Sequence, residues 1–543
     1  MKKSKVFLLA AVGLLSVGVL TACSSSSKTS GKTYNYVYGS DPATLDYLAT
    51  NKKNMTTAVS NGVDGLFEND QYGNLKPSVA EDWSVSQDGL TYTYKIRKGL
   101  KWYTSDGEEY ANVTAKDFVT GLKHAADTNS EAIYLLQNSV KGLNDYLSGA
   151  NKDFSNVGIK AVDDYTLQYT LSQPEPYWNS KLTYSVTWPV NGEFLKSKGK
   201  DFGKSTDPTS ILYNGPYLLK SLTTKSSIEF TKNENYWDKD HVYFDNIKLT
   251  YDDGSDQESL ERNFTDGVYN LARLFPTSSN YSKVEKQYKD NIFYTQPGSA
   301  VEGVGINIDR QTYGHTSKEN DQQKTSTKTA LLNKDFRQSL GFAIDRTNYA
   351  AQLNGKEGGS TAVRNIFVKP DFVQADGKDF GTMVMDQLPA YGDEWSGVNL
   401  ADSQDGLYNP EKAKAEFAKA KEALQAEGVQ FPIHLDVPVN QSSKITVNQV
   451  QSIKQSVESA LGKDNVVLDI HQLSADDFNN ITYSASNAAA EDWDLSVGVA
   501  WDPDYLDPST YLDVLKTTSS EHTKSFMGYD DPNSHAVQTV GLK

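Results

Sequence analysis

The sequence is almost free of cysteine, since Cys23 is the only one in 543 residues. A single cysteine excludes a disulfide bond within the chain. Small secreted domains often need such bonds because their hydrophobic cores are small. A chain of this length does not need them, since large domains bury most of the surface that their unfolded chains expose. The length by itself predicts about three to four structural units.

Positive charge is also in short supply. Lysine and arginine together number 53 against 70 aspartates and glutamates, so the formal net charge is -17. This balance argues against nucleic acid or an anionic membrane surface as the partner, because both repel an acidic protein. It mildly favours cationic ligands. After Cys23 the sequence also has no apolar run of the ~20 residues that a membrane-spanning helix needs.

The common signatures of catalysis are missing as well. The seven histidines are scattered, and neither a His-Glu-x-x-His nor a Gly-x-Ser-x-Gly motif occurs. The segment Gly203-Lys204-Ser205 is not a P-loop, because the position five before the Gly-Lys pair holds Lys198. We therefore expect no enzymatic activity, no cofactor and no metal site. A hydrolase that uses dispersed carboxylates stays open as a competing interpretation.

The first 23 residues have the pattern of an export signal. Lys2, Lys3 and Lys5 form a short basic start, and an uncharged, mostly apolar run over residues 6–20 follows. It ends in Leu-Thr-Ala-Cys, which resembles the bacterial lipobox. The resemblance implies that residues 1–22 are a lipoprotein signal peptide, removed by cleavage before Cys23, whose sulfur then carries a lipid. An ordinary signal peptide with a stray cysteine is the alternative. Residues 23–32 are rich in serine and predict a flexible lipidated tether.

Residue patterns predict alternating strands and helices along the rest of the chain. Residues 33–38 place three tyrosines on one face, as a half-buried strand does. Asn409-Pro410 is typical of the N-cap and first residue of a helix. A helix over 447–461 lies between strands at 435–439 and 466–470, which indicates an α/β protein. Further strands are predicted at 90–97, 166–171, 217–221 and 228–231.

Two other segments complete the prediction of local structure. Thr114-x-x-Asp117 resembles a capping box at the start of a helix. The polar stretch over residues 312–329 has no apolar periodicity, so we expect a surface loop there.

A series of sequence blocks runs in order from about residue 34 to 512. The blocks are Asp41-Pro42-x-Thr44-Leu45-Asp46, residues 65–68, 75–83, 88–102, 114–118, Asn214-Gly215-Pro216-Tyr217, 233–238, 336–346, 408–413 and Trp501-x-x-Asp504-Tyr505-x-Asp507-Pro508. Each block alone is a weak signal. Together they resemble the oligopeptide-binding proteins of ABC importers, and the lipobox and serine-rich tether most resemble the Gram-positive Ami and Ali type.

The resemblance implies the architecture. The fold class is α/β, of the periplasmic-binding-protein-like type II, with two hinged lobes and an additional inserted domain. The expected first lobe is discontinuous, the inserted domain interrupts it, and the second lobe follows. The ranges are 33–60 and 174–302 for lobe I, 61–173 for inserted domain II and 303–515 for lobe II. Residues 516–543 are expected to be a truncated return segment, since family members usually continue further.

The resemblance also implies a ligand site. In the family, the aspartate of the Trp-x-x-Asp-Tyr block binds the α-amino group of a peptide, and Asp504 holds this position. The side chains of Trp501 and Tyr505 would form the walls of the site. The backbone over residues 497–500, with Val499 and Ala500, would pair with the ligand as an added strand. The alternative is that Asp504 is a solvated acidic residue of a loop and has no role in binding.

Asp41 is a weaker candidate on the opposite lobe, where its side chain could simply cap a turn.

The expected protein captures oligopeptides at the extracellular face of the cell membrane, held there by a lipid on Cys23. Its expected partners are the ABC permease and ATPase subunits, and we expect a monomer that does not bind nucleic acid. Two alternatives remain: a binder of carbohydrate or another solute on the same fold, and a surface receptor or adhesin that does not transport.

Overall fold

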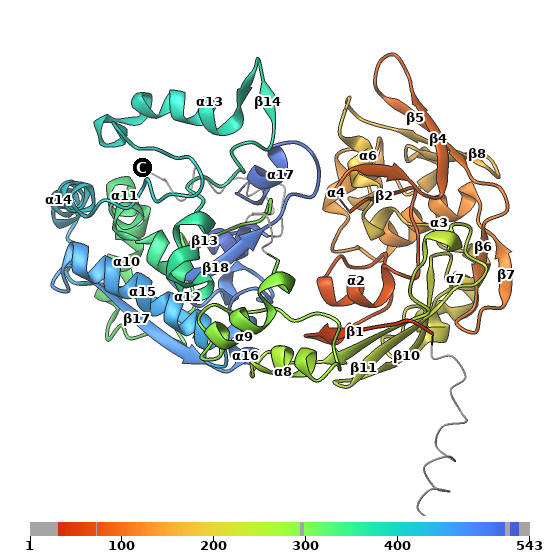
Figure 1. Ribbon diagram of the computed structural model, residues 1–543. Helices are drawn as coiled ribbons and strands as arrows, with labels where there is room; N and C mark the ends of the chain where they lie inside the picture. The colour runs from red at the N-terminus through yellow and green to blue at the C-terminus, as the bar shows by residue number, and fades with distance from the viewer. Residues whose placement is uncertain (1–30, 72, 294–297, 516–521, 531–543) are drawn as a thin grey trace, which may run out of the picture.

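The computed structural model describes residues 31–71, 73–293, 298–515 and 522–530. The predicted signal peptide, Cys23 and most of the tether lie outside the described residues, as does most of the predicted return segment. Figure 1 shows two groups of elements side by side. We call residues 31–293 the first lobe and residues 298–530 the second lobe. None of the helices that the structure describes combines the length and apolar character needed to cross a bilayer.

The first lobe opens with a four-stranded sheet in the order β1-β12-β11-β10. Strand β1 (Thr33–Tyr38) pairs in parallel with β12 (Asn246–Tyr251), and β11 (Ser227–Lys232) pairs antiparallel with both β12 and β10 (Tyr217–Thr223). The strand predicted at 33–38 is therefore confirmed, and so are the strands predicted at 217–221 and 228–231. The pairing of β1 with β12 joins residues more than 200 positions apart.

A second four-stranded sheet, in the order β4-β5-β9-β8, lies within residues 80–170. Its strands are β4 (Ala80–Val85), β5 (Thr91–Ile96), β9 (Thr166–Thr170) and β8 (Ile159–Asp163). Helix α3 (Ala115–Asp127) contacts this sheet and begins with the predicted capping box of Thr114 and Asp117. The other elements of the first lobe are α2 (Lys53–Val59), β2 (Phe67–Asn69), β3 (Leu75–Pro77), β6 (Lys101–Tyr103), β7 (Glu109–Asn112), α4 (Tyr134–Gln137), α5 (Leu143–Leu147), α6 (Trp178–Lys181), α7 (Gly192–Lys198), α8 (Ser259–Thr265) and α9 (Tyr281–Tyr288).

One hydrophobic core joins residues of the first lobe from Tyr38 to Phe230. Large aromatic side chains fill much of it, including Trp102, Trp178 and Tyr213, none of which is exposed. This core includes the segment 61–173, which we expected to form an inserted domain. The segment thus shares its interior with the residues on either side of it. The proposed domain boundaries remain a prediction.

The second lobe is built on two parallel strands and the helix that connects them. Strands β16 (Ile433–Asn440) and β17 (Val466–Leu473) pair in parallel, and α15 (Lys444–Leu461) connects them. The sequence predicts this order of strand, helix and strand. The other elements are β13 (Val301–Ile306), α10 (Asp321–Leu332), α11 (Lys334–Ala343), α12 (Arg346–Gly358), β14 (Gln374–Ala375), β15 (Lys378–Asp379), α13 (Phe380–Gln387), α14 (Pro410–Ala426), α16 (Ala475–Asn480), β18 (Leu495–Trp501), α17 (Ser509–Leu512) and α18 (Thr523–Met527). Its core is mainly aliphatic.

Helix α10 corrects one prediction, because the segment 312–329 is not a loop throughout. Asn320 caps the helix by accepting a hydrogen bond from the N–H of Gln323. The buried face consists of Ser326, Thr327, Ala330 and Leu331. Small polar side chains occupy half of that face, so the apolar spacing that marks an amphipathic helix is missing from the sequence.

A buried network of charges ties the segment before α10 to the strands of the second lobe. Arg310 bonds to Asp436 at 2.7 Å and to Asp492 at 2.8 Å, and Lys318 bonds to Asp436 at 2.7 Å. Both cations also pair with Asp494. All five side chains are almost fully buried. The network therefore holds the connection after β13 in one place on the second lobe.

Candidate functional site

The carboxylate of Asp504 lies at the boundary between the lobes. Asp504 follows β18 in the second lobe, and its backbone N–H donates to the Thr510 hydroxyl at 2.7 Å. The two carboxylate oxygens accept hydrogen bonds from the first lobe, one from the hydroxyl of Tyr134 and one from that of Tyr184, each at 2.9 Å. Figure 1 shows α17, which follows Asp504, facing α4 and α6 of the first lobe. The site is thus assembled from both lobes.

Burial raises the pKa of Asp504 to about 6, although the hydroxyls of Tyr184 and Tyr134 act in the opposite direction. At neutral pH the group is still mostly ionised, and its direct hydrogen-bond partners are neutral. A buried carboxylate held by neutral donors is well suited to bind a cation, because the cation adds charge-assisted hydrogen bonds where water is scarce.

Trp501 and Tyr505 lie on either side of Asp504 in the chain and face different neighbours. The Trp501 indole donates to the Thr510 carbonyl at 2.8 Å, and its ring lies 5.0 Å from that of His522. The Tyr505 ring stacks on Tyr177 of the first lobe at 5.1 Å, with an interplanar angle of 19°. Trp501 therefore packs within the second lobe, whereas Tyr505 crosses the boundary between the lobes.

Val499 and Ala500 lie near the C-terminal end of strand β18. Strand β18 pairs antiparallel with β13, Ala500 opposite Glu302 and Val499 opposite Gly303, and a bulge interrupts the register at Gly498. Gly498 has a φ of +86°, which glycine adopts without strain. Within the described residues, β13 is the one ladder partner of β18. The opposite edge near the exposed Ala500 is therefore without a partner strand there.

Asp41 is held entirely within the first lobe. Its carboxylate accepts from the Tyr38 hydroxyl at 2.9 Å and from the backbone N–H of Lys225 at 2.9 Å and 3.1 Å. Asn54 donates to its backbone carbonyl at 2.8 Å. Asp41 therefore ties the start of the chain to the turn between β10 and β11, and the described contacts do not bring it to Asp504. A role in ligand binding stays a prediction.

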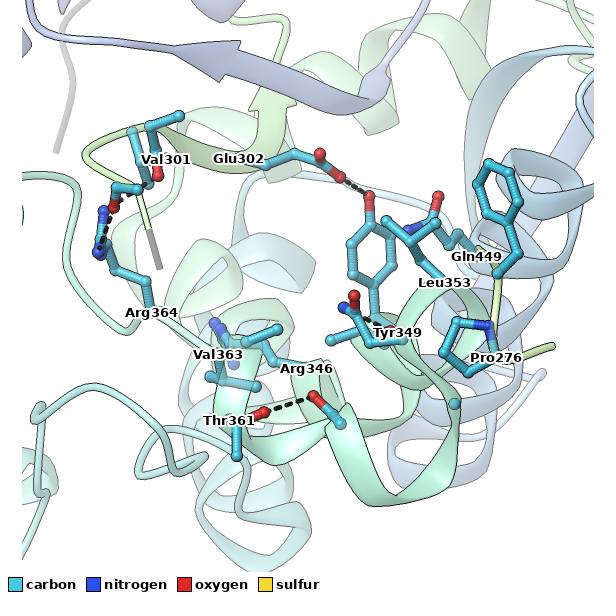
Figure 2. Close-up of a pocket in the computed structure, with 18 of the residues that line it drawn as sticks. Pro276, Val301, Glu302, Arg346, Tyr349, Leu353, Thr361, Val363, Arg364 and Gln449 are labelled. Carbon is cyan, nitrogen blue, oxygen red and sulfur yellow. Dashed lines mark hydrogen bonds between the residues drawn. The ribbon is translucent and has the colours of Figure 1, made fainter. Parts of the chain in front are cut away.

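A cavity with a volume of about 2060 Å³ lies beside β13 (Figure 2). This is larger than the ~300–1,000 Å³ of most small-molecule sites. Its wall includes Glu302, whose carboxylate accepts from the Tyr349 hydroxyl. Arginines in the wall, Arg346 and Arg364 among them, donate to backbone carbonyls. None of the ligand-binding residues predicted from the sequence lines the cavity, although its wall strand β13 pairs with β18.

Comparison with known proteins identifies the family. The sequence pattern of the bacterial extracellular solute-binding proteins, family 5 Middle, matches residues 74–522. The chain belongs to this family. Its members are extracellular solute-binding proteins, and the match covers most of both lobes.

Individual relatives and solved structures agree with this assignment. This solute-binding protein is 68% identical to the oligopeptide-binding protein AmiA of Streptococcus pneumoniae, over 100% of this chain and 83% of that one. It is 60% identical to the oligopeptide-binding protein SarA of Streptococcus gordonii, with the same coverage of both chains. Listeria monocytogenes OppA bound to peptide shares the fold, with a TM-score of 0.68 and 24% identity over 93% of this chain and 87% of that one.

Sequence reasoning about this solute-binding protein missed the residues of the first lobe that face Asp504. Tyr134 lies 370 positions away from Asp504 in the chain, and Tyr184 lies 320 positions away. Lys181, whose charge also acts on Asp504, is equally remote. The sequence holds 32 tyrosines, and no local pattern distinguishes these two. Only the docking of one lobe against the other singles them out.

Proposed function

We propose that this solute-binding protein captures oligopeptides outside the cell and delivers them to the membrane subunits of an ABC importer. The observation that carries the proposal is the buried Asp504 carboxylate, held at the lobe boundary by two neutral hydroxyls. The names of the close relatives AmiA and SarA, which are described as oligopeptide-binding proteins, support it.

The chemistry of a peptide fits this arrangement. Its α-amino group has a pKa of about 8 and is mostly cationic at neutral pH. In the proposed complex Asp504 binds this ammonium group, and Trp501 and Tyr505 flank it. The backbone of the peptide adds to the edge of β18 near Val499 and Ala500. Pairing through the backbone ignores side-chain identity, so one site serves many sequences.

We also propose that the protein is anchored to the membrane and that it has no catalytic activity. A lipid on Cys23 would hold it at the outer face of the membrane, and residues 24–32 would act as its tether. It would work as a monomer with the permease and ATPase subunits as partners. It would bind without breaking bonds, so that closure of the lobes, not catalysis, passes on the cargo.

The decisive experiment compares Asp504→Asn with the parent protein by titration calorimetry. The two ligands are one pentapeptide and its N-acetylated form, which lacks the positive charge. We expect Asp504→Asn to weaken binding of the free peptide by roughly tenfold or more, because one partner of a buried charge pair is lost. The same substitution should change binding of the acetylated peptide little.

Two controls accompany this comparison. Asp41→Asn tests the weaker candidate, and circular dichroism checks that each variant is folded. Equal losses for the free and the acetylated peptide would remove Asp504 from the ammonium site. If neither peptide binds the parent protein, the proposed ligand class is wrong.

A further inference from the structure

A second contact between the lobes lies next to Asp504. The ammonium group of Lys181, at the end of α6 in the first lobe, lies 4.3 Å from the centre of the Tyr505 ring. The ring of Tyr177 is 5.3 Å from the same ammonium group, and it also stacks on Tyr505. The backbone N–H of Leu506 donates to the Ser180 hydroxyl at 3.4 Å. Three consecutive residues of the second lobe, 504–506, therefore touch the first lobe.

Neighbouring residues of the first lobe hold the Lys181 side chain in position for this contact. Its side chain is only 5% exposed and forms an ion pair at 3.1 Å with Glu175, which is also buried. The ammonium group donates to the Ser139 hydroxyl at 2.9 Å. Burial lowers the pKa of Lys181, while the Glu175 carboxylate acts in the opposite direction. Glu175 and Ser139 thus keep the ammonium group in place, and the ring of Tyr505 covers its outer side.

Tyr505 is likewise held by its own lobe. Its hydroxyl donates to the Asp513 carboxylate at 2.9 Å and lies 3.2 Å from the Ser509 hydroxyl. The ring also packs against the hydrophobic core of the first lobe. Because both partners are oriented before they meet, the contact loses little side-chain freedom when the lobes close. An ammonium group over an aromatic face is attracted to it, and more strongly where water is excluded.

We propose that Lys181 is a positioning residue, which holds residues 504–506 against the first lobe through Tyr505 and so keeps the lobes closed over a bound peptide. The proposal rests on the proposed function for the identity of the cargo. Lys181 acts through Tyr505, and its ammonium group also pairs with Glu175 at 3.1 Å. When the lobes separate, Lys181 loses the ring that covers it.

The consequence is a specific change in rates. A contact that forms on closure slows escape of the peptide without affecting its entry into the open cleft. Removal of the contact should therefore raise the dissociation rate constant by roughly fivefold, within the range expected for a desolvated cation–π pair. The association rate constant of the Lys181 variant should not fall, because a more open cleft is no harder to enter.

The test uses Tyr505→Leu, and Lys181→Met combined with Glu175→Gln so that no carboxylate is left buried without its cation. Stopped-flow measurements with a fluorescent pentapeptide give both rate constants for each variant and for all three changes together. If the two sites are coupled, the peptide should dissociate from the combined variant no faster than from the faster of the two separate variants. Tyr505→Phe keeps the ring and should restore most of the slow dissociation.

A matched control is Lys198→Met, because Lys198 lies 5.3 Å from the Phe194 ring within the first lobe and away from the boundary. It should leave both rate constants unchanged. Fully additive effects of Tyr505→Leu and the Lys181 variant would overturn the proposal, since they would show that Tyr505 and Lys181 act separately.

Small-angle X-ray scattering of the protein without peptide separates this proposal from the proposed function. We expect a larger radius of gyration for Tyr505→Leu and for the Lys181 variant than for the parent protein. An increase in radius together with no peptide binding by the parent would reject the proposed function but support the role of Lys181 in closure. Unchanged radii in both variants would reject the role of Lys181 in closure.

Discussion

Buried aspartates chosen from the two lobes, Asp64 and Asp117 in the first and Asp436 in the second, lie in opposite electrostatic settings. In the first lobe, Asp64 accepts from the hydroxyls of Tyr236 at 2.8 Å and Ser78 at 3.5 Å, and burial raises its pKa to about 7. Asp117 accepts from the Trp102 indole at 3.0 Å, and burial raises its pKa to about 6. Neutral donors do not offset the loss of hydration, so these acids hold their protons more tightly.

In the second lobe, Asp436 is fully buried but contacts cations. Burial by itself would raise its pKa, and the contacts with His471 and Lys318 outweigh that effect, so its pKa lies far below the usual value. Arg310 adds a further ion pair at 2.7 Å. Burial alone therefore does not decide the charge of an aspartate. The partner that the fold brings to the carboxyl group decides it.

Glu491 shows that the rule concerns partners and not lobes. It lies in the second lobe, is fully buried, and accepts from the Trp493 indole at 2.6 Å. Burial raises its pKa to about 8, and the indole donor acts in the opposite direction. Asp504, between the lobes, follows the same pattern as Asp64, since burial raises its pKa while neutral hydroxyls act in the opposite direction.

The largest expected effect comes from breaking the charge network of the second lobe. Arg310→Met leaves three buried carboxylates with one cation fewer, so we expect a loss of about 3–5 kcal/mol in the free energy of unfolding. The measurement is urea unfolding of both proteins. Lys220→Met is the control, since Lys220 pairs with Asp106 on the surface and should cost ~1 kcal/mol or less. A loss as small as that of the control would contradict a stabilising role for the network.

A smaller effect is expected from Asp64→Asn in the first lobe, and it depends on pH. The folded-state pKa of about 7 lies above the unfolded value, so Asp64 stabilises the fold below the unfolded pKa, and this contribution is lost as pH rises through about 7. The variant should be less sensitive to pH, and at pH 9 more stable than the parent by roughly 2–4 kcal/mol. Thermal unfolding between pH 5 and 9 measures the difference. Parallel curves for the two proteins would show that Asp64 does not titrate as stated.

Binding should depend on pH through the same principle. Asp504 has a pKa of about 6, and the ammonium group of a peptide has one of about 8. Peptide affinity should therefore be highest between these values and fall by roughly tenfold per pH unit well below 6, where the carboxyl group is neutral. Calorimetry between pH 4.5 and 9 measures it. In Asp504→Asn the acidic limb should be absent, and its persistence would assign it to another group.

The smallest expected effect concerns a neutral acceptor near the surface. Asn409 accepts from the backbone N–H of Lys412 at the start of α14. Asn409→Ala should cost about 1 kcal/mol, whereas Asn409→Asp should cost almost nothing, because a carboxylate also caps a helix and favours its N-terminus. Urea unfolding compares the three proteins. A large destabilisation by Asn409→Asp would mean that even this half-buried position penalises charge.

Local structure could be predicted where neighbouring residues carry the signal. Strand β1 and the Asn409 cap of α14 lie where the sequence places them. Helix α10 could not be predicted, because Ser326 and Thr327 are polar and only packing against the rest of the second lobe buries them. In the same way, the lipobox resemblance at Cys23 is a sequence signal whose outcome lies outside the described residues.

The sequence by itself determined the alternation of strands and helices and the family, and it predicted that Asp504 binds an ammonium group. These follow from side-chain pattern and from motifs in which the informative residues are neighbours. Only the tertiary structure decided that Tyr134 and Tyr184 hold that carboxylate and that Lys181 lies over Tyr505. The strength of an ionic or hydrogen-bonding interaction depends on burial and on partners hundreds of residues away, and folding alone brings these together.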